Sequence, residues 1–287
     1  MRLKPIFNVS LLFILVLCIS VVMNVVFAPR KFAIQDSYNY SRFPKSKRVE
    51  WSWAKNGAKD GVLIAQTSDN SSFRKLLEVS RLGNEAYAKL KGFDYVAMIG
   101  MYKGFRESHA AFNKIFLLNE LIEKYQQQYH IVIYLDADAV IVNSSLEPKQ
   151  ILAPLDSSVL AACTWFSEPP WNINNGVMFW NLRHSQSRVL ARTWLDAAWR
   201  EMWAGGTDDQ APLQRLLQSW FGTWRQSLLR IYTGADFELF NYRGRYIEHV
   251  LRAEDGMTFR TDSIAARVSV LRQILLRCNI TVPDSKT

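Results

Sequence analysis

The sequence predicts an α/β fold with a mostly parallel central sheet, preceded by a single N-terminal transmembrane helix. Three short apolar runs alternate with two longer segments of helical periodicity between residues 61 and 135, which is typical of consecutive strand and helix units. A long uncharged run precedes them near the N-terminus. The third apolar run, 131–135, ends in Asp136 and Asp138, two acids separated by one residue. These observations predict the topology, the membrane attachment and the position of a site.

The N-terminal apolar run extends from Ile6 to Ala28 and contains 23 residues without a charge. A helix of this length, rising about 1.5 Å per residue, crosses a bilayer. A cleavable signal peptide is the alternative, since Val26-Phe27-Ala28 fits a small-residue cleavage pattern. The run exceeds a normal signal-peptide core, however, and Pro29 would directly follow the cut. We therefore expect an uncleaved signal anchor, with an orientation that the flanking basic residues leave open.

The rest of the chain is expected to form a stem and one globular domain, and its composition and charge limit the class of protein. We expect a cytoplasmic tip and transmembrane anchor at 1–28, a stem at 29–58 and one globular domain at 59–287. A content of 49% hydrophobic and 13% aromatic residues excludes a disordered protein. The net charge is +9, but the densest basic run, 42–48, lies in the stem, so we expect no nucleic-acid partner.

Within the globular domain, periodicity predicts the elements in order. The expected strands are 61–67, 93–99, 131–135, 160–165, 177–181, 228–232 and 246–249. The expected helices are 73–90, 109–127, 186–203, one that begins at Thr207, and 264–276. The two crossovers between the first three strands indicate parallel neighbours with right-handed connections.

The two acids at the end of the third strand are the strongest chemical signal. An unpaired buried charge is costly, so a positive group should meet Asp136 and Asp138. Two carboxylates suit a hard cation such as Mg²⁺ or Mn²⁺, and ligands of open α/β sheets collect at the carboxyl ends of the strands. The pattern favours a metal-bound phosphate compound at this strand end. A solvated turn after a strand is the alternative.

Two polar clusters could contribute to the same site. Asn174 and Asn175 precede a glycine and a strand, and their amides suit sugar hydroxyls, although a simple turn is the alternative. Asp208, Asp209 and Gln210 open a predicted helix. The two acids could cap that helix and complement its dipole, or they could face a cleft and bind a substrate.

Two single residues complete the candidates. His249 lies near a late strand end, where a histidine is commonly structural. If it reached the two acids, it would complete a mixed carboxylate and imidazole site suitable for Mn²⁺. Lys114 lies on the helix before the Asp strand and could meet a diphosphate as a point charge. An ordinary exposed lysine is the alternative.

Taken together and in order, these residues resemble glycosyltransferase family 34, the galactosyl/xylosyl/mannosyltransferases. The features that carry the resemblance are the anchor and stem, the first strand ending at Thr67, Phe112-Asn113-Lys114-Ile115, Tyr134-Leu135-Asp136-Ala137-Asp138-Ala139, Asn174-Asn175-Gly176-Val177, Asp208-Asp209-Gln210 and the late strand with His249. They cover about residues 60 to 255. The chain departs from the family at Phe112, where a Trp is usual, and directly after His249, where small residues and Gly are common.

The resemblance implies a type II membrane protein of the Golgi whose luminal catalytic domain, 59–287, has a GT-A (Rossmann-like) fold that binds a nucleotide sugar. Acceptor patterns for N-glycosylation at Asn39, Asn70, Asn143 and Asn279 are compatible with such a glycoprotein. The implied donor is a UDP- or GDP-sugar and the implied acceptor is a glycan hydroxyl.

The resemblance also implies residue roles. Asp136, Asp138 and His249 would hold Mn²⁺ (or Mg²⁺) on the donor diphosphate. The donor-binding residues would be Thr67, Lys114, Asp136, Asp138, Asn174 and Asn175, and the catalytic residues would be Asp209 and Gln210. Family members retain the anomeric configuration, so Asp209 could be a nucleophile, although a front-face mechanism without one is equally open.

Three alternatives compete with a retaining transferase. The first is an inverting GT-A transferase of another family that shares only the nucleotide site. The second is a membrane-anchored carbohydrate-binding protein without turnover. The third is a metal-dependent phosphohydrolase, which would hydrolyse simple phosphate esters.

Overall fold

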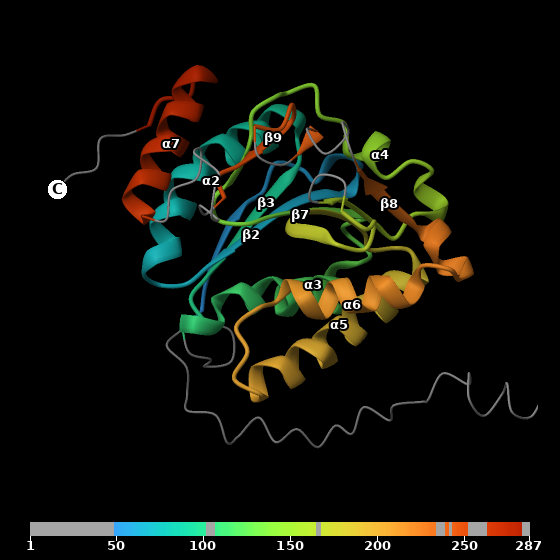
Figure 1. Ribbon diagram of the computed structural model, residues 1–287. Coiled ribbons are helices and arrows are strands. Elements are labelled where there is room, and N and C mark those ends of the chain that lie inside the picture. The colour runs from blue at the N-terminus through green and yellow to red at the C-terminus, as the bar shows by residue number, and fades with distance from the viewer. Residues whose placement is uncertain are drawn as a thin grey trace, which may run out of the picture. The chain divides into compact units, whose positions relative to one another are not determined.

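The computed structural model describes residues 49–101, 107–164, 168–233, 239–240, 243–251 and 263–282. Within these residues a seven-stranded sheet lies between two layers of helices (Figure 1). Helices α2 (Ser72–Lys91) and α7 (Ile264–Arg277) cover one face. Helices α3 (Asn113–Tyr125), α5 (Ser185–Trp203) and α6 (Gln210–Trp220) cover the other. A short helix, α4 (Pro148–Ile151), lies between the fifth and sixth strands in sequence.

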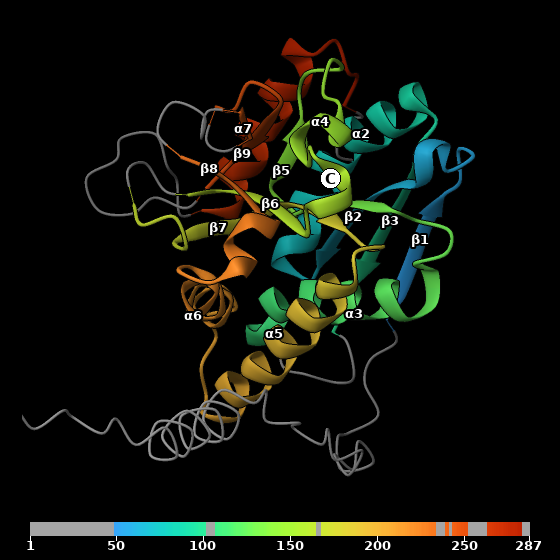
Figure 2. The same ribbon diagram turned by 90° about the vertical axis from the view of Figure 1, so that its right-hand side faces the viewer.

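The strands are β1 (Glu50–Ala54), β2 (Val62–Ser68), β3 (Asp94–Ile99), β4 (Ile131–Leu135), β5 (Ala139–Ile141), β6 (Leu160–Thr164), β7 (Ile173–Asn181), β8 (Leu229–Tyr232) and β9 (Ile247–His249). The order in the sheet is β1-β3-β2-β4-β7-β6-β8, with β1 and β8 at opposite edges (Figure 2). Strands β5 and β9 form a separate antiparallel ribbon. The α/β architecture predicted from the sequence is therefore present.

The sheet is mixed, but most of its strands are parallel, since β2, β3, β4, β6 and β8 run in one direction and only β1 and β7 run in the other. The β3-β2-β4 core is parallel, as the two predicted crossovers require. Strands β1 and β7, however, run antiparallel to their neighbours. The physical reason lies partly in the connection from β6 to β7, which is too short for a parallel crossover of a dozen or more residues.

The sheet also includes residues that the sequence analysis assigns to the stem. Strand β1 pairs with β3 in the register Glu50 to Ile99. Its tryptophans, Trp51 and Trp53, stack with ring centres 6.4 Å apart and pack against the core. The aromatic side chains of this segment are thus part of the sheet's packing, and the compact fold includes residues before the expected boundary at 59.

The expected anchor at 1–28 lies outside the described residues. Among the helices that the structure does describe, none has the length and apolar character needed to cross a bilayer.

Helix α2 shows why the predicted strand and helix units form. At its start, Asp69 accepts hydrogen bonds from the backbone amides of Phe73 and Arg74, at 2.8 and 3.2 Å, which satisfies donors that the first turn leaves unpaired. At its end, Gly92 adopts a φ of 75° and closes the helix, a conformation that glycine adopts without steric cost. Both signals are local in the sequence.

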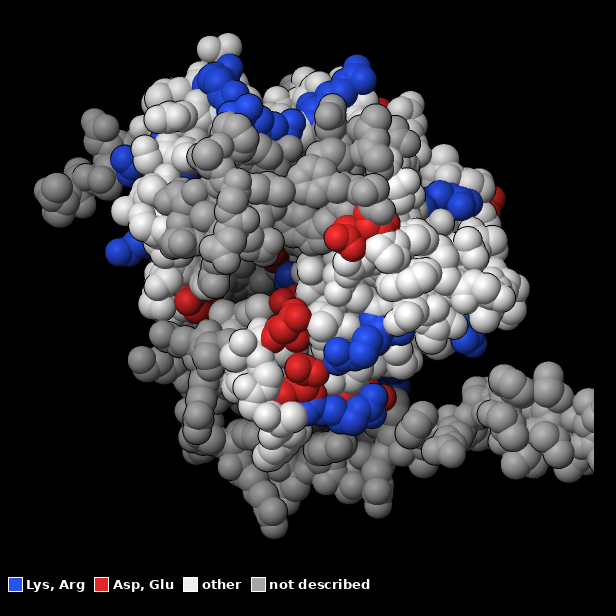
Figure 3. Space-filling view, viewed as in Figure 1, with Lys and Arg blue, Asp and Glu red and all other residues white. Residues whose placement is uncertain are grey.

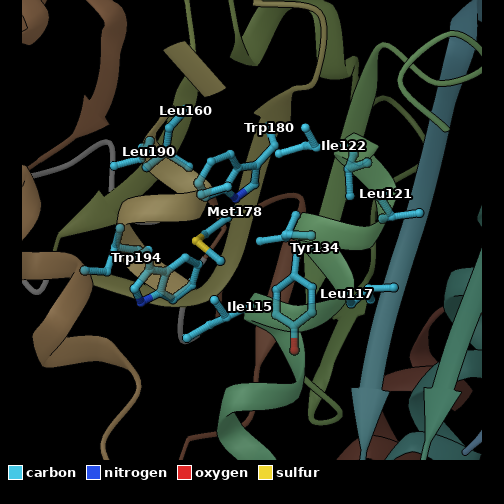
Figure 4. Close-up of a cluster of buried hydrophobic side chains, with 14 of the residues drawn as sticks. Ile115, Leu117, Leu121, Ile122, Tyr134, Leu160, Met178, Trp180, Leu190 and Trp194 are labelled. Atoms are coloured by element: carbon cyan, nitrogen blue, oxygen red, sulfur yellow. The ribbon is translucent and has the colours of Figure 1, made fainter. Parts of the chain in front are cut away.

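A large apolar cluster fills the space between the sheet and helices α3, α5 and α6. Trp180 of β7 and Trp194 of α5 stack with ring centres 6.2 Å apart and an interplanar angle of 1°. Figure 4 shows the ring of Tyr134 beside these apolar side chains, with its hydroxyl directed away from them. The hydroxyl instead hydrogen-bonds to Asp136 at 3.0 Å. The core therefore orients a polar group of β4 toward the strand end.

Three strand ends meet at one edge of the sheet. Gln66 of β2 pairs with Leu135 of β4, and Leu135 pairs with Val177 of β7. Because β7 is antiparallel to β4, its first residues lie where β2 and β4 end. This arrangement places Asn174 and Asn175 beside the two acids that follow β4.

Candidate active site

A cavity of about 560 Å³ opens at this edge of the sheet, which is within the range of small-molecule sites. Its lining includes the nine residues to which the sequence analysis assigns a binding or catalytic role, which are Thr67, Lys114, Asp136, Asp138, Asn174, Asn175, Asp209, Gln210 and His249. The surface in Figure 3 shows acidic and basic side chains next to each other around a hollow. The structure thus brings the candidate residues together, while their roles remain predictions.

Asp136, Asp138 and His249 form a group that could hold a metal ion. One ligand atom from each lies within 4.8 Å of the other two. His249 Nε2 lies 3.1 Å from Asp138 Oδ1 and 4.0 Å from Asp136 Oδ2. Two carboxylate oxygens and one imidazole nitrogen are a donor set that suits Mn²⁺. The residues therefore fit a divalent ion, and the identity of the ion stays open.

The β5–β9 ribbon carries His249 to the two acids. Ala139 pairs with His249 in this ribbon, and the backbone amide of Val250 donates to the Asp138 carbonyl at 2.9 Å. Gly176 makes room for the imidazole, because an added Cβ there would lie 2.1 Å from His249 Cε1 and 2.8 Å from Asp136 Oδ2. Backbone pairing thus places β9 beside the two acids, and the close approach of the imidazole explains why residue 176 is a glycine.

Buried polar side chains hold the backbone of the Asp136–Ala139 turn. Gln66 Nε2 donates to the Asp136 carbonyl at 3.1 Å. Ser80 Oγ donates to the Ala137 carbonyl at 2.8 Å, and Asn84 Nδ2 donates to the Ala139 carbonyl at 3.0 Å. The sequence analysis does not single out these three residues. A glutamine inside an apolar strand and polar residues on the buried face of a helix are the signals that it could have used.

Lys114 is a central cation of the site and is buried, so the alternative of an exposed lysine is wrong. Its Nζ lies 2.9 Å from Asp136 Oδ1, 3.0 Å from Asp209 Oδ2 and 3.1 Å from Asn175 Oδ1. Burial alone would lower the pKa of Lys114, but the carboxylates of Asp136 and Asp209 raise it above its ordinary value. Lys114 is therefore positively charged at neutral pH.

The two carboxylates beside Lys114 differ in their electrostatics. Burial tends to raise the pKa of Asp136, yet Lys114 and His249 hold it below its ordinary value. Burial raises the pKa of Asp209 above its ordinary value, since the favourable effect of Lys114 is smaller and Asp136 adds repulsion. Asn175 Nδ2 also donates to Asp209 Oδ2 at 2.6 Å. Asp209 is thus the more basic carboxylate of the pair.

Asp208 and Gln210 have different environments from Asp209. Asp208 Oδ1 accepts from the backbone amides of Gln210 and Ala211, at 2.8 and 3.3 Å. Asp208 therefore caps α6, which is one of the two roles that the sequence analysis considers for it. The helix begins at Gln210 rather than at Thr207. Gln210 Oε1 accepts from the backbone amide of Asn175 at 3.1 Å. Gln210 therefore fixes the asparagine segment against the start of α6.

The remaining candidates are hydrogen-bonded at the cavity wall. Asn174 Oδ1 accepts from the backbone amide of Gly176 at 2.8 Å. Thr67 Oγ1 lies 2.9 Å from the Tyr134 hydroxyl, which in turn donates to Asp136 at 3.0 Å. The end of β2 is thus linked through Tyr134 to the first acid.

Arg267 of α7 is a site residue that the sequence analysis missed. It lines the cavity and its Nη2 contacts Asp138 Oδ2. Burial lowers the pKa of Arg267 to about 10, so the guanidinium remains charged at neutral pH. Arg267 lies on the buried face of α7 with Leu271 and Ile274. A cation at a helical spacing otherwise occupied by apolar residues is the sequence signal for this contact.

Comparisons with known proteins were made at the level of sequence and of structure. No family model matches the chain, and no curated protein matches it either. Among solved structures, a glycosyltransferase involved in the glycosylation of the major capsid of PBCV-1 is similar. It has a TM-score of 0.52 and 14% identity, over 74% of this chain and 98% of that chain.

Two further structures align with lower scores. The glycosyltransferase GlyE of Streptococcus pneumoniae TIGR4 has a TM-score of 0.41 and 12% identity over 78% of this chain and 65% of that chain. The galactosyltransferase LgtC in complex with donor and acceptor sugar analogues has a TM-score of 0.45 and 14% identity over 77% of this chain and 98% of that chain. These two matches are too weak to support an argument.

The likeness to the PBCV-1 enzyme concerns the fold alone, because the sequence identity is only 14%. It agrees with the α/β class and with the central sheet that the sequence predicts. The resemblance to glycosyltransferase family 34 remains a prediction.

Proposed function

We propose that the protein is a metal-dependent GT-A glycosyltransferase that moves a sugar from a nucleotide-sugar donor to a glycan hydroxyl, with retention of configuration. One observation carries this proposal. The possible metal ligands Asp136, Asp138 and His249 share a single cavity with the Lys114–Asp209–Asn175 cluster. The likeness of the fold to a glycosyltransferase supports the same reading.

The donor would be a UDP- or GDP-sugar and the ion Mn²⁺ or Mg²⁺. When bound, the ion would supply Lewis-acid chemistry by neutralising charge on the departing diphosphate. The carboxylates and the imidazole would hold this ion at the end of β4. Lys114 would add a second positive charge near the diphosphate, because its Nζ lies only 2.9 Å from the ligand residue Asp136.

Transfer would join the acceptor oxygen to the anomeric carbon and break the bond from that carbon to the diphosphate oxygen. In a front-face reaction the acceptor proton leaves with the diphosphate. In a double displacement, Asp209 would first bond to the anomeric carbon and then be replaced by the acceptor. Asp209 is the carboxylate proposed for this role because it lines the cavity and lies outside the candidate ligand group. Gln210 and Asn174 would orient the sugar from the cavity wall.

We also propose that the protein is a single-pass type II protein of the Golgi membrane, attached through the apolar segment 6–28 with its catalytic domain in the lumen. The argument is the length and uncharged character of this segment. Microscopy of the tagged full-length protein with Golgi markers, together with glycosidase digestion, tests this location. A cytosolic protein without attached glycans would contradict it.

The test of activity uses the full-length protein in detergent with UDP- and GDP-sugars and Mn²⁺. We expect release of nucleoside diphosphate that stops when a chelator is added. Proton NMR of the product then gives its anomeric configuration: inversion would favour another GT-A family. Binding without any release would favour a carbohydrate-binding protein, and hydrolysis of simple phosphate esters would favour a phosphohydrolase.

A matched pair of variants tests the role of Asp209. Asp209→Asn should lower transfer by at least about 10²-fold, because it removes the charged oxygen beside Lys114. Asp208→Asn should stay within about threefold, because asparagine also caps helices. Equal losses in both variants would contradict a specific role for Asp209.

A further inference from the structure

Arg267 occupies a position that the proposed transfer reaction does not explain. Its side chain is 2% exposed, and its Nε donates to the Val250 carbonyl at 3.1 Å. The guanidinium carbon lies 6.0 Å from the centre of the Phe73 ring at the start of α2. Such burial of a cation is costly unless a partner compensates it. The partner here is Asp138, whose Oδ2 contacts Arg267 Nη2.

The carboxylates of Asp136 and Asp138 contact their neighbours in the same way, with one oxygen toward a cation and the other toward His249. Asp138 directs Oδ1 to His249, at 3.1 Å, and Oδ2 to Arg267. Asp136 directs Oδ2 toward His249, at 4.0 Å, and Oδ1 to Lys114, at 2.9 Å. One oxygen of each carboxylate is thus held by a buried cation, and the other faces the imidazole. A cation that holds one oxygen of a carboxylate leaves only the other oxygen available to an ion.

We propose that Arg267 is a positioning residue that makes Asp138 a single-oxygen metal ligand and keeps the loaded site positive enough to receive a diphosphate. This inference rests on the proposed function and adds a residue from the C-terminal helix to it. It assigns no contact between Arg267 and the donor, because the Arg267 side chain is only 2% exposed and its Nη2 is engaged by Asp138.

The charges explain why the site needs Arg267. Asp136, Asp138 and Asp209 are in contact with Lys114 or Arg267, and together these five groups carry one net negative charge with the histidine neutral. A divalent ion converts this into one net positive charge, which attracts a diphosphate. Without Arg267, the loaded cluster would be neutral.

Removal of Arg267 should therefore shift two affinities in opposite directions. The ion alone should bind more tightly, because a nearby repelling charge is gone and both oxygens of Asp138 become available. This repulsion persists at an effective dielectric constant near 20, so we expect at least about a tenfold gain in Mn²⁺ affinity. The nucleoside diphosphate should bind about tenfold more weakly. A purely structural role would weaken both.

The experiment compares the full-length wild type with Arg267→Met and Arg267→Lys. Free Mn²⁺ is measured by electron paramagnetic resonance without nucleotide, and binding of UDP and GDP is measured by calorimetry at saturating Mn²⁺. Arg267→Lys keeps the charge, so its Mn²⁺ affinity should stay within about threefold of wild type. Arg277→Met is the matched control, since Arg277 is on the same helix, is 65% exposed and pairs with Glu248; it should change neither affinity.

Circular dichroism melting checks that each variant folds. If Arg267→Met does not fold, Arg267→Gln removes the charge while keeping a donor for the Val250 carbonyl. Loss of Mn²⁺ affinity in a folded charge-free variant, or no change in either affinity, would overturn the proposal. If the wild type binds Mn²⁺ but neither nucleotide, the proposed function fails, whereas the Mn²⁺ measurement still decides whether Arg267 positions Asp138.

Discussion

His249 Nε2 lies 3.1 Å from Asp138 Oδ1, although 111 positions separate the two residues. The contact depends on the pairing of β9 with β5, which directly follows the Asp136–Asp138 turn. The backbone amide of Val250 reinforces it by donating to the carbonyl of Asp138. The candidate metal site is completed only when the late strand β9 pairs with β5 in their separate ribbon. We expect its ligands to be separable from the fold of the main sheet.

His249→Ala tests this separation. The variant removes the one nitrogen ligand, so we expect Mn²⁺ affinity to fall by at least about 10-fold while the far-ultraviolet circular dichroism spectrum stays unchanged. Calorimetric titration of Mn²⁺ measures the change. His184→Ala is the control, because His184 accepts from the Gln186 amide at the start of α5 and lies outside the ligand group. An unchanged Mn²⁺ affinity in the His249 variant would show that the triad is not the metal site.

Asp136→Asn tests the first acid. Asparagine keeps the size of the side chain but removes the charge that pairs with Lys114 and faces His249. We expect transfer to fall by at least about 10²-fold with the fold intact, because the ion and Lys114 each lose one of their two anionic partners. Product release and thermal melting are measured together, with the exposed Asp156→Asn as control. A variant that no longer folds would point to a structural role for the acid.

Gly176→Ala tests whether the close approach of β7 to the ligands matters. The added methyl group would lie 2.1 Å from His249 Cε1, so the imidazole must move. We expect Mn²⁺ affinity to fall by about 10- to 100-fold. Gly83→Ala is the comparison, because its methyl group would instead meet Val140 and Leu275 in the core, at 2.6 and 2.8 Å.

The two glycine variants should therefore differ in kind. Overpacking at Gly83 should lower stability by about 1–3 kcal/mol and leave Mn²⁺ binding within about threefold of wild type. Chemical denaturation measures the first quantity and Mn²⁺ titration the second. If Gly176→Ala loses stability but binds Mn²⁺ normally, the steric argument for this position is wrong.

The parallel core and the polar strand ends could be predicted from the sequence because both leave local patterns. The capping group of Asp69 and the terminal Gly92 delimit α2. The abrupt change from the apolar β4 to Asp136 and Asp138 indicates where a ligand would bind. Thr67 and the two acids reach one cavity because the parallel strands β2 and β4 end at the same end of the sheet.

Other features depend on pairings between distant segments, which no local pattern specifies. The alternation in residues 50–54 does not show that β1 will pair with β3 rather than belong to a stem. The reversal of β7 depends on its register with β4 and β6. For the same reason the contact of Arg267 with Asp138 could not be predicted, although a cation on the apolar face of α7 indicates that some buried anion should be nearby.

Asp94 provides a pH-dependent test of the fold away from the cavity. Its Oδ1 accepts from the backbone amides of Asn56 and Ala58, at 2.7 and 3.1 Å, and its Oδ2 accepts from the Tyr129 hydroxyl at 2.7 Å. Burial tends to raise the pKa of Asp94, but these hydrogen bonds, with Lys55, hold it below its ordinary value of 3.8. The carboxylate thus ties the segment after β1 to β3 and to the end of α3.

A lowered pKa means that the folded state favours the ionised form. The stabilisation is complete above the pKa of the unfolded chain, about 3.9, and is lost as the pH falls through the lower pKa of the folded protein. Asp94→Asn should therefore cost about 2–3 kcal/mol at neutral pH, and the difference from wild type should shrink below about pH 4. Urea denaturation across this pH range measures it. Asp60→Asn is the control, because it breaks an exposed pair with Lys149 and should cost less than about 1 kcal/mol at every pH. If the stability difference between Asp94→Asn and wild type does not depend on pH, the role assigned to the charge of Asp94 is wrong.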